Sequence, residues 1–173
     1  MKFDLDKTVE ILQQTPYTLQ RMLDGLSPEW TGSRGDRENW APYDVIGHLI
    51  HGEETDWIPR AEIILTQGEN RTFDKYDRLA QFEKSKGKPL SDLLTEFAHL
   101  RSANIEKLVR MQLTQEQLQL KGIHPALGEV TLEQLLATWA VHDLNHIRQI
   151  VVYMGKLYGE EVGPWKEYLL ILN

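Results

Sequence analysis

The sequence contains no cysteine among its 173 residues. This absence excludes disulfide bonds, thiolate metal sites and a cysteine nucleophile within the chain. It also excludes zinc fingers, which depend on cysteine ligands. A metal site here would therefore use other ligands, and any reactive sulfur must be supplied by another molecule.

The sequence also lacks a long apolar run and a basic stripe. No stretch approaches the roughly 20 apolar residues that span a membrane, and Met1–Asp6 has no apolar signal core. The net charge is −7, and Lys and Arg are scattered along the chain, which is unfavourable for binding phosphate backbones. We therefore expect a cytoplasmic protein with no membrane or nucleic-acid partner.

Helical periodicity dominates the rest of the sequence. The length suits one domain with a hydrophobic core, so we expect a single domain over residues 1–173. Apolar residues recur at helical spacing in four segments, which predicts helices at 5–26, 42–67, 91–111 and 131–157. With few strand signals, the pattern indicates an all-α protein, an antiparallel four-helix bundle.

Local signals refine the ends and breaks of these helices. Pro16 and Pro59 predict kinks. Ser91 is a plausible N-cap, and Thr131 with Gln134 forms a capping-box pattern.

The connections between the predicted helices are polar. Residues 31–39, 68–89 and 112–130 are interpreted as loops, with a short helix near residues 76–83. Residues 164–172 can form a short closing helix.

Two histidines one helical turn apart, His142 and His146, are the most informative feature. Residues i and i+4 share a helix face, with Cβ atoms about 5–6 Å apart. Both histidines fall in the apolar row of their helix, so they face the bundle interior. Buried polar groups need partners. One divalent metal would satisfy both imidazoles; alternatively, each histidine hydrogen-bonds to a neighbouring helix.

A catalytic metal usually takes three protein ligands and keeps a position open for water. His48 is the best candidate for the third ligand because it lies on the apolar side of the second helix. Gly47 and Gly52, which cost helix stability, would leave room beside it for a metal and a substrate. His51 is a competitor, and we expect it at the rim of the site or among the residues that support the ligands. His99 and His124 are weaker candidates, because lone histidines are usually structural or exposed.

Several carboxylates lie near these histidines. Asp143 points about 100° away from His142 around the helix, so we expect an inter-helix salt bridge or a capping role. Glu53 and Glu54 are the candidate catalytic residues, and Asp56 shares their helix. Each could orient a ligand or act as a general base, and a solvated helix face explains all three equally well.

Apolar side chains suggest further roles. Trp40, Trp57 and Trp139 are candidates to line a pocket, although core packing is the more common role. On the fourth helix, a second apolar group lies off the metal face and predicts self-association. It consists of Val141, Leu144, Ile147 and Val151.

Two motifs carry a family resemblance: WAPYDVIGHL at residues 40–49, followed by Glu53 and Glu54, and WAVHDLNHIRQ at residues 139–149. With the helix order and length, the chain resembles the DinB/YfiT-like superfamily of metal-binding four-helix bundles over essentially its whole length. The motifs are fairly specific for the superfamily and weak for any one activity.

The resemblance implies a metal triad formed by His48, His142 and His146. One departure is Ala41, where the family often has a Ser or Thr helix cap. The implied cofactor is one divalent ion, with Zn or Ni expected first and Fe, Co or Mn also suited.

The resemblance also implies a class of reaction. Members with known activity are transferases or isomerases that use a low-molecular-weight thiol, such as bacillithiol, mycothiol or glutathione. We therefore expect a homodimeric, thiol-dependent S-transferase acting on a small electrophile. The alternatives are a metal-dependent hydrolase, a non-catalytic metal- or ligand-binding stress-response protein, and a structural bundle with buried histidines.

Overall fold

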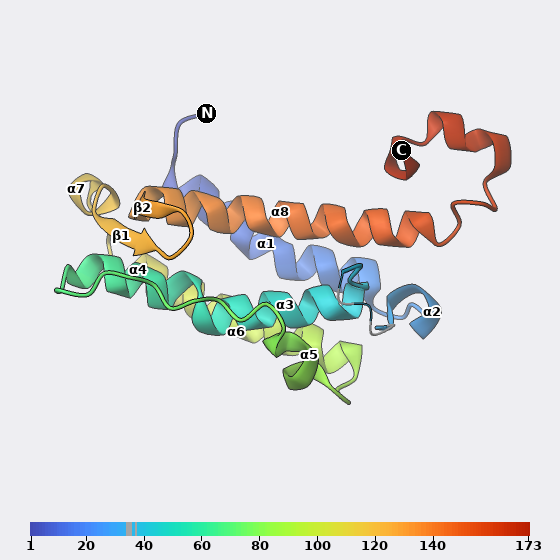
Figure 1. Ribbon diagram of the computed structural model, residues 1–173, viewed down its shortest axis with the longest axis horizontal. Coiled ribbons are helices and arrows are strands. Elements are labelled where there is room, and N and C mark those ends of the chain that lie inside the picture. Colours follow the sequence, from blue (N-terminus) through green and yellow to red (C-terminus); the bar gives the residue numbers. More distant parts are fainter. Residues whose placement is uncertain (34–35, 37) are drawn as a thin grey trace.

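The computed structural model describes residues 1–33, 36 and 38–173. It confirms the all-α, four-helix bundle (Figure 1). Five helical segments build the four long rods of the bundle: α1 (Leu5–Leu23), α3 (Pro42–Thr55) with α4 (Trp57–Thr66), α6 (Leu90–Arg110) and α8 (Leu132–Lys156).

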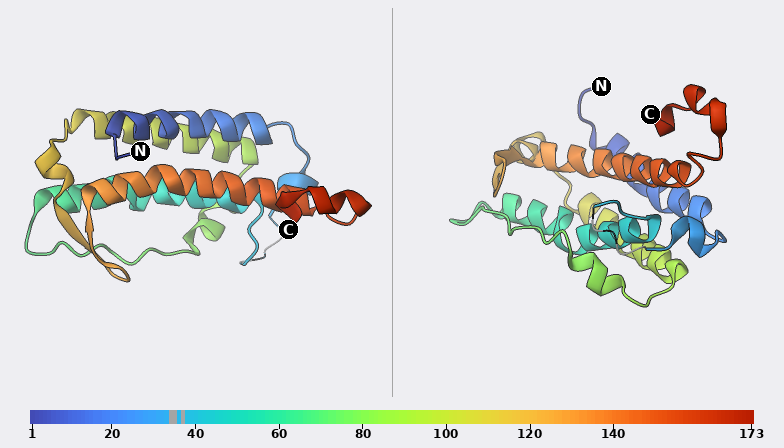
Figure 2. Two further views of the ribbon diagram at one scale, coloured as in Figure 1. Left: turned by 90° about the horizontal axis from the view of Figure 1, so that it is seen from above. Right: turned by 45° about the vertical axis from the view of Figure 1, so that its right-hand side comes forward.

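The four rods form two layers, seen most clearly in the left view of Figure 2. One layer holds α1 and α6, and the other holds α3–α4 and α8, with contacts between the layers. α1 and α8 run in one direction, whereas α3–α4 and α6 run in the other. The antiparallel pairs are therefore α1 with α6 and α3–α4 with α8. The chain between α4 and α6 returns along the outside of α3–α4, which makes α6 parallel to them (Figure 1).

α1 begins at its N-cap Asp4, whose side chain accepts a hydrogen bond from Lys7 N at 3.1 Å. It continues through Pro16 and ends at Leu23, three residues before the predicted end. Gly25 follows with a φ of +76°, a conformation that terminates a helix.

The predicted second helix is divided in two at Asp56, where φ is −105° and ψ is −70°. The kink expected at Pro59 is thus displaced to the preceding turn. Proline has no N–H to donate to the carbonyl four residues back, and its ring clashes with that carbonyl. That carbonyl belongs to Thr55, the last residue of α3.

Of the two capping predictions for helix starts, one is wrong and one is confirmed. The N-cap prediction for Ser91 is wrong, because α6 is capped by Pro89 and Ser91 lies in its first turn. The capping box of α8 is confirmed: Thr131 Oγ1 accepts from Gln134 N at 3.2 Å, and Thr131 N donates to Gln134 Oε1 at 2.9 Å.

The connections contain more structure than expected. The short helix predicted near residues 76–83 is α5 (Ala80–Ser85). The loop predicted at 31–39 begins at the end of α2 (Pro28–Thr31), and Arg34, Gly35 and Arg37 lie outside the described residues. The closing helix consists of two 3-10 turns, Gly163–Tyr168 and Leu170–Leu172.

The prediction of a plain loop at 112–130 is wrong. This segment holds α7 (Gln115–Leu118) and an antiparallel hairpin of β1 (Lys121–His124) and β2 (Gly128–Thr131). The strands are too short to show a clear alternating pattern, and contacts with the rest of the chain stabilise them. Phe73 N donates to Ile123 O at 2.9 Å. A Cβ at Gly122 would lie 2.6 Å from the Phe73 ring, so only glycine fits this approach.

The core consists of two apolar clusters, one toward each end of the bundle. Buried polar residues lie between them along α3, α6 and α8: His48, His51, Glu53, Arg101, Asn104, Asp143 and His146. The candidate site therefore occupies a polar layer in the middle of the bundle.

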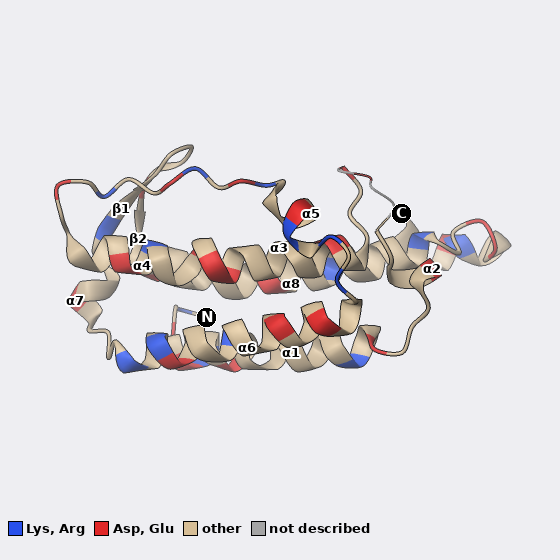
Figure 3. Cartoon of the chain, turned by 90° about the horizontal axis from the view of Figure 1, so that it is seen from below, with Lys and Arg blue, Asp and Glu red and all other residues tan. Residues whose placement is uncertain are grey.

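Acidic and basic residues of the described chain are interspersed along the helices (Figure 3). Among the described residues, no helix combines the length and the apolar character needed to cross a membrane.

Candidate metal centre

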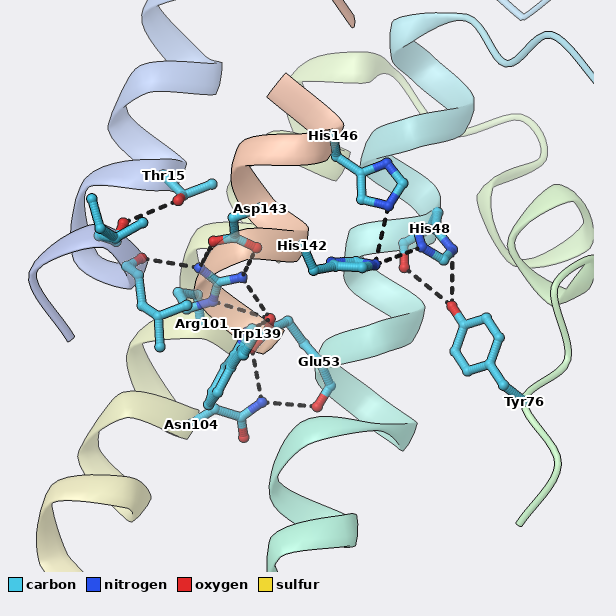
Figure 4. A network of polar contacts seen from close by, with 12 residues as sticks. Thr15, His48, Glu53, Tyr76, Arg101, Asn104, Trp139, His142, Asp143 and His146 are labelled. Carbon is cyan, nitrogen blue, oxygen red and sulfur yellow. Dashed lines mark hydrogen bonds and ion pairs between the residues drawn. The ribbon is translucent and has the colours of Figure 1, made fainter. Parts of the chain in front are cut away.

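The structure brings the three predicted histidines together from two helices. His48 lies on α3, and His142 and His146 lie one turn apart on α8 (Figure 4). His142 Nε2 lies 3.1 Å from His48 Nε2 and 3.0 Å from His146 Nε2. Among the described residues, these three alone form a group of at least three His, Asp or Glu side chains close enough to share a metal ion.

The nitrogen positions fit a divalent ion. Zinc–nitrogen bonds of about 2.0–2.1 Å place two ligand nitrogens about 2.9–3.4 Å apart at angles of about 90–109°. Both measured Nε2 separations lie in this range. Without an ion, His142 Nε2 faces two other ring nitrogens. A hydrogen bond between two ring nitrogens contains one proton, so one nitrogen of each pair must donate and the other accept. The donor set therefore suits a shared cation better than a set of hydrogen bonds.

In two of the three rings, the Nδ1 atom contacts a neighbouring polar side chain. His146 Nδ1 lies 2.8 Å from Gln149 Oε1, and this amide oxygen accepts a hydrogen bond from the Nδ1–H group. The neutral ring then keeps its lone pair on Nε2, which faces the cluster. His48 Nδ1 lies 2.9 Å from the Tyr76 hydroxyl (Figure 4). Such partners fix the tautomer and orientation of metal-binding histidines.

Burial keeps these imidazoles neutral. Burial, with a further contribution from the neighbouring histidines, lowers the pKa of His48 to about 2 and that of His142 to about 3. Burial also lowers the pKa of His146, partly offset by its hydrogen bond to Gln149. Neutral imidazole is the form that binds metal, so the site is ready for a cation at neutral pH.

The tryptophans surround the site and also build the core. Trp40 packs on the His48 ring with centroids 5.0 Å apart. Trp57 meets His142 edge-on at 5.0 Å and stacks on Trp139 at 5.6 Å. Trp139 is fully buried and donates to Glu53 Oε1. Of the three, Trp40 lines the cavity beside the histidines.

A buried ion network lies beneath the histidines (Figure 4). The Arg101 guanidinium on α6 donates to Asp143 on α8 and to Glu53 on α3. Asn104 Nδ2 donates to Glu53 Oε2 at 3.0 Å. The inter-helix salt bridge expected for Asp143 is therefore confirmed.

The Arg101 network also reaches α1. Arg101 Nη1 donates to Leu12 O at 3.0 Å. Leu12 lies four residues before Pro16, and proline cannot donate to that carbonyl. The network therefore joins all four rods of the bundle at one level.

The structure does not place the candidate catalytic residues Glu53 and Glu54 at the site. Both oxygens of Glu53 accept hydrogen bonds within the buried network. Glu54 is exposed and forms an ion pair with Lys84. Neither lines the cavity beside the histidines. Asp56, the third carboxylate of this group, does line it, from its position at the break between α3 and α4.

The remaining histidines lie apart from the triad. His51 is buried, with its ring 4.9 Å from that of Tyr76 and Nδ1 3.3 Å from Lys84 Nζ. Of the two positions expected for it, this one is behind the triad, next to the partner of His48, rather than at the rim. His99 is exposed on α6. His124 is not near the triad nitrogens but lines the same cavity from the end of β1.

The two glycines near His48 do not provide room for a ligand, contrary to expectation. A Cβ at Gly47 would meet Ser85 of α5, and a Cβ at Gly52 would lie 3.3 Å from Trp57 Nε1. They permit close packing of α5 and Trp57 instead. Ala41 offers no side-chain cap to α3, and Asp44 Oδ2 accepts from Ala41 N at 3.1 Å.

The histidines open into a cavity of about 1310 Å³ that is open to solvent. The crossing segment after α4 and the hairpin form much of its wall. Residues that sequence reasoning did not place at the site come from these segments and from α4: Lys75, Tyr76 and Arg78 lie in the crossing segment, His124 in the hairpin and Arg60 in α4. Their sequence carries no motif, and only the path of the chain brings them to α3 and α8.

Comparison with known proteins agrees with this arrangement. The family model of the DinB superfamily matches residues 11–150. Among solved structures, the chain is similar to YfiT from Bacillus subtilis, described as a probable metal-dependent hydrolase with an unusual four-helix bundle topology. The TM-score is 0.73 at 24% identity, over 90% of this chain and 87% of that one, which shows a shared fold. No curated protein sequence matches the chain. From the family match, we conclude that this chain belongs to the DinB superfamily.

Proposed function

We propose that His48, His142 and His146 hold one divalent metal ion and that the protein is a metal-dependent, thiol-using S-transferase. Zn or Ni is the expected metal, and Fe, Co and Mn are compatible with nitrogen ligands. The observation that carries the proposal is the grouping of three neutral imidazoles, with ligand nitrogens all within 4.8 Å of one another, at the wall of an open cavity.

A metal held there would supply Lewis acidity and lower the pKa of a bound water or thiol toward neutrality. The chain's own groups prepare this chemistry. Tyr76 and Gln149 orient two of the imidazoles. Trp40 and Trp57 shield the rings of His48 and His142 from solvent.

The composition supports an external thiol. The chain has no cysteine, so the sulfur that is transferred must come from a small molecule. A cavity of about 1310 Å³ is large enough for a thiol cosubstrate together with a small electrophile. In a substitution, the sulfur bonds to the electrophile and the leaving group departs with the thiol proton. In a conjugate addition, the sulfur and the thiol proton both add to the electrophile.

The test is a conjugation assay with metal-loaded protein. Bacillithiol, mycothiol and glutathione are each supplied with a panel of alkyl halides, epoxides and activated alkenes, and thioether formation is measured by mass spectrometry. The proposal predicts metal-dependent conjugation with at least one thiol that is lost in His142→Asn. Thioether yields equal to those of the metal-free protein across the panel would contradict it.

A second candidate is metal-dependent hydrolysis, favoured by the description of the structurally similar YfiT. The same cation could activate water without any thiol. Ester and amide panels without added thiol separate the two reactions. Metal-loaded protein that is inactive in both assays would favour a metal-binding protein without turnover.

A further inference from the structure

A second group of polar side chains lines the cavity away from the histidine triad. Arg60 comes from α4 and His124 from the end of β1. Both pack on the buried Phe73: the Arg60 guanidinium carbon lies 5.2 Å from the ring centroid, and the His124 ring meets it edge-on at 6.3 Å. Side chains from α4, from the segment that follows it and from the hairpin therefore meet at Phe73.

Arg60 is fixed with donors to spare. It is only 8% exposed, and its Nη2 lies 2.7 Å from Asp56 Oδ1, one helical turn earlier. A guanidinium carries five N–H donors in a planar fork. The ion pair with Asp56 involves one nitrogen and leaves the other donors of the fork.

His124 is held in one tautomer by the hairpin turn. Its Nδ1 accepts hydrogen bonds from Ala126 N at 3.1 Å and Leu127 N at 3.2 Å. A ring that accepts at Nδ1 carries its proton on Nε2, so Nε2 is a donor. Burial and the Arg60 charge lower the pKa of His124, which favours this neutral form.

The charge of the cavity wall differs from that of the whole chain. Although the net charge is −7, the lining has three basic side chains (Arg60, Lys75 and Arg78) and two acidic ones (Glu38 and Asp56). Asp56 is already paired with Arg60. Lys75 and Arg78 are exposed and add positive potential near the entrance.

We propose that Arg60 and His124 bind a carboxylate group of the small-molecule ligand whose reactive end meets the histidine triad. A guanidinium fork and a neutral imidazole N–H both donate to a carboxylate, and the charge-assisted bonds to Arg60 are the stronger ones. The inference rests on the proposed function for the reactive end of the ligand. The carboxylate belongs either to the thiol or to the electrophile.

The first measurement compares thiols of different charge. Protein loaded with Co²⁺ is titrated with mercaptosuccinate and with 2-mercaptoethanol, and the thiolate-to-Co²⁺ charge-transfer absorption gives each dissociation constant. If the thiol supplies the carboxylate, mercaptosuccinate binds at least about tenfold more tightly than 2-mercaptoethanol. One hydrogen bond to a charged group changes a dissociation constant by about this factor. In parallel, succinate binding to metal-free protein is followed by NMR titration, which detects a carboxylate site whichever ligand supplies the group.

Two substitutions of His124 separate recognition from turn stability. In His124→Asn, the side-chain oxygen can still accept the backbone N–H groups of the turn, as in an Asx-turn, but the Nε2 donor is lost. In His124→Gln, an amide N–H replaces the Nε2 donor while the turn acceptor is lost. The proposal predicts succinate binding that is weakened about tenfold by His124→Asn and retained in His124→Gln. Lys86→Gln, which removes an exposed charge outside the cavity, is the control and should retain binding.

Each outcome decides one claim. Succinate binding that depends on His124 in this way supports the carboxylate site. Tighter binding of mercaptosuccinate than of 2-mercaptoethanol then assigns the carboxylate to the thiol. Equal affinities for the two thiols assign it to the electrophile. Failure of both thiols to bind contradicts the proposed thiol chemistry and leaves the succinate result to decide the site. No succinate binding, an unchanged affinity in His124→Asn, or a greater loss in His124→Gln would overturn the proposal.

Discussion

In His48 and in His146, the Nδ1 atom of the imidazole contacts a neighbouring side chain. Tyr76 and Gln149 hold these nitrogens at 2.9 and 2.8 Å. A ligand whose ring is already oriented loses less entropy when the metal binds, and its tautomer is correct in advance. We therefore expect the metal affinity of the proposed site to depend on residues that do not touch the metal.

Substituting Tyr76 with Phe should weaken metal binding about 10–100-fold, the usual effect of removing such a partner. The ring and its packing against His48 are retained, so the change isolates the hydroxyl. Competition with a chromogenic chelator measures the dissociation constant. Tyr168→Phe, at a tyrosine that is 77% exposed, is the matched control. Equal affinities for Tyr76→Phe and the wild type would show that the hydroxyl has no role in the site.

The metal-free protein should lose stability as the pH falls below about 6.5. Burial lowers the pKa of His48 to about 2 and of His142 to about 3. Between these values and about 6.5, the unfolded chain binds protons that the folded chain does not. Each histidine therefore removes about 1.4 kcal/mol of unfolding free energy per pH unit in this window.

Denaturant unfolding at about pH 7 and about pH 5 measures this slope, against the background of other titrating groups. His142→Gln should reduce the slope, whereas His99→Gln, at an exposed position, should leave it unchanged. A slope that is the same in all three proteins would contradict the burial of neutral His142.

The grouping of the three histidines was predictable at this scale, whereas several residues around the cavity were not. The i,i+4 spacing and the apolar row identified His142 and His146. His48 was identified by its position on the apolar face of the second predicted helix. Tyr76 and His124 lie in a connection and a hairpin with no helical period. Their positions depend on contacts such as Phe73 N to Ile123 O, which no local pattern encodes.

At the scale of helices, Arg101 joins the rods of the bundle. It is 1% exposed and pairs with Glu53 on α3 and Asp143 on α8, while it also donates to α1. Asp143 directly follows His142, so this network fixes the rotation of α8 that points His142 toward α3. Sequence spacing indicated that Asp143 faces another helix, but it did not identify Arg101 as the partner.

Replacing Arg101 with Met should destabilise the protein by about 3–5 kcal/mol, because two carboxylates remain buried without their cation. Chemical denaturation at neutral pH measures the loss. Arg110→Met removes a comparable side chain that is 77% exposed from the same helix and should cause little change. If the two variants are equally stable, the buried network does not hold the helices together.

The helix boundaries show where local sequence rules apply. The Thr131–Gln134 capping box set the start of α8 because both bonds form within one turn. The break at Asp56 and the hairpin depend on the path of neighbouring segments. The fold class was thus predictable from apolar periodicity, whereas the direction of α6 depends on the crossing connection, whose course has no periodic signal.

At the scale of the whole molecule, α8 exposes apolar side chains away from the histidines. Val141 is 63% exposed and Leu144 is 49% exposed. Ile147 and Val151 continue this group and are partly buried. We propose that a second copy of the chain covers this surface, because an exposed apolar stripe on a bundle helix favours association.

Sedimentation velocity at micromolar concentration should then show a species heavier than the 20.1 kDa monomer. Leu144→Asp should shift the protein toward monomer, since a charge on this stripe would be desolvated on association. Val109→Asp, at a residue of α6 that is 57% exposed, is the control. A wild-type protein that sediments only as a monomer would refute the proposed dimer.

The most direct test of the account is the metal content of the purified protein, measured by elemental analysis and native mass spectrometry at neutral pH. The account predicts one divalent ion per folded chain in the wild type, unchanged in His99→Asn, and loss of that ion in His142→Asn with the helical circular dichroism spectrum retained. A wild-type protein that binds no divalent ion when supplied with Zn²⁺ or Ni²⁺, or a folded His142→Asn that keeps a full equivalent, would contradict it.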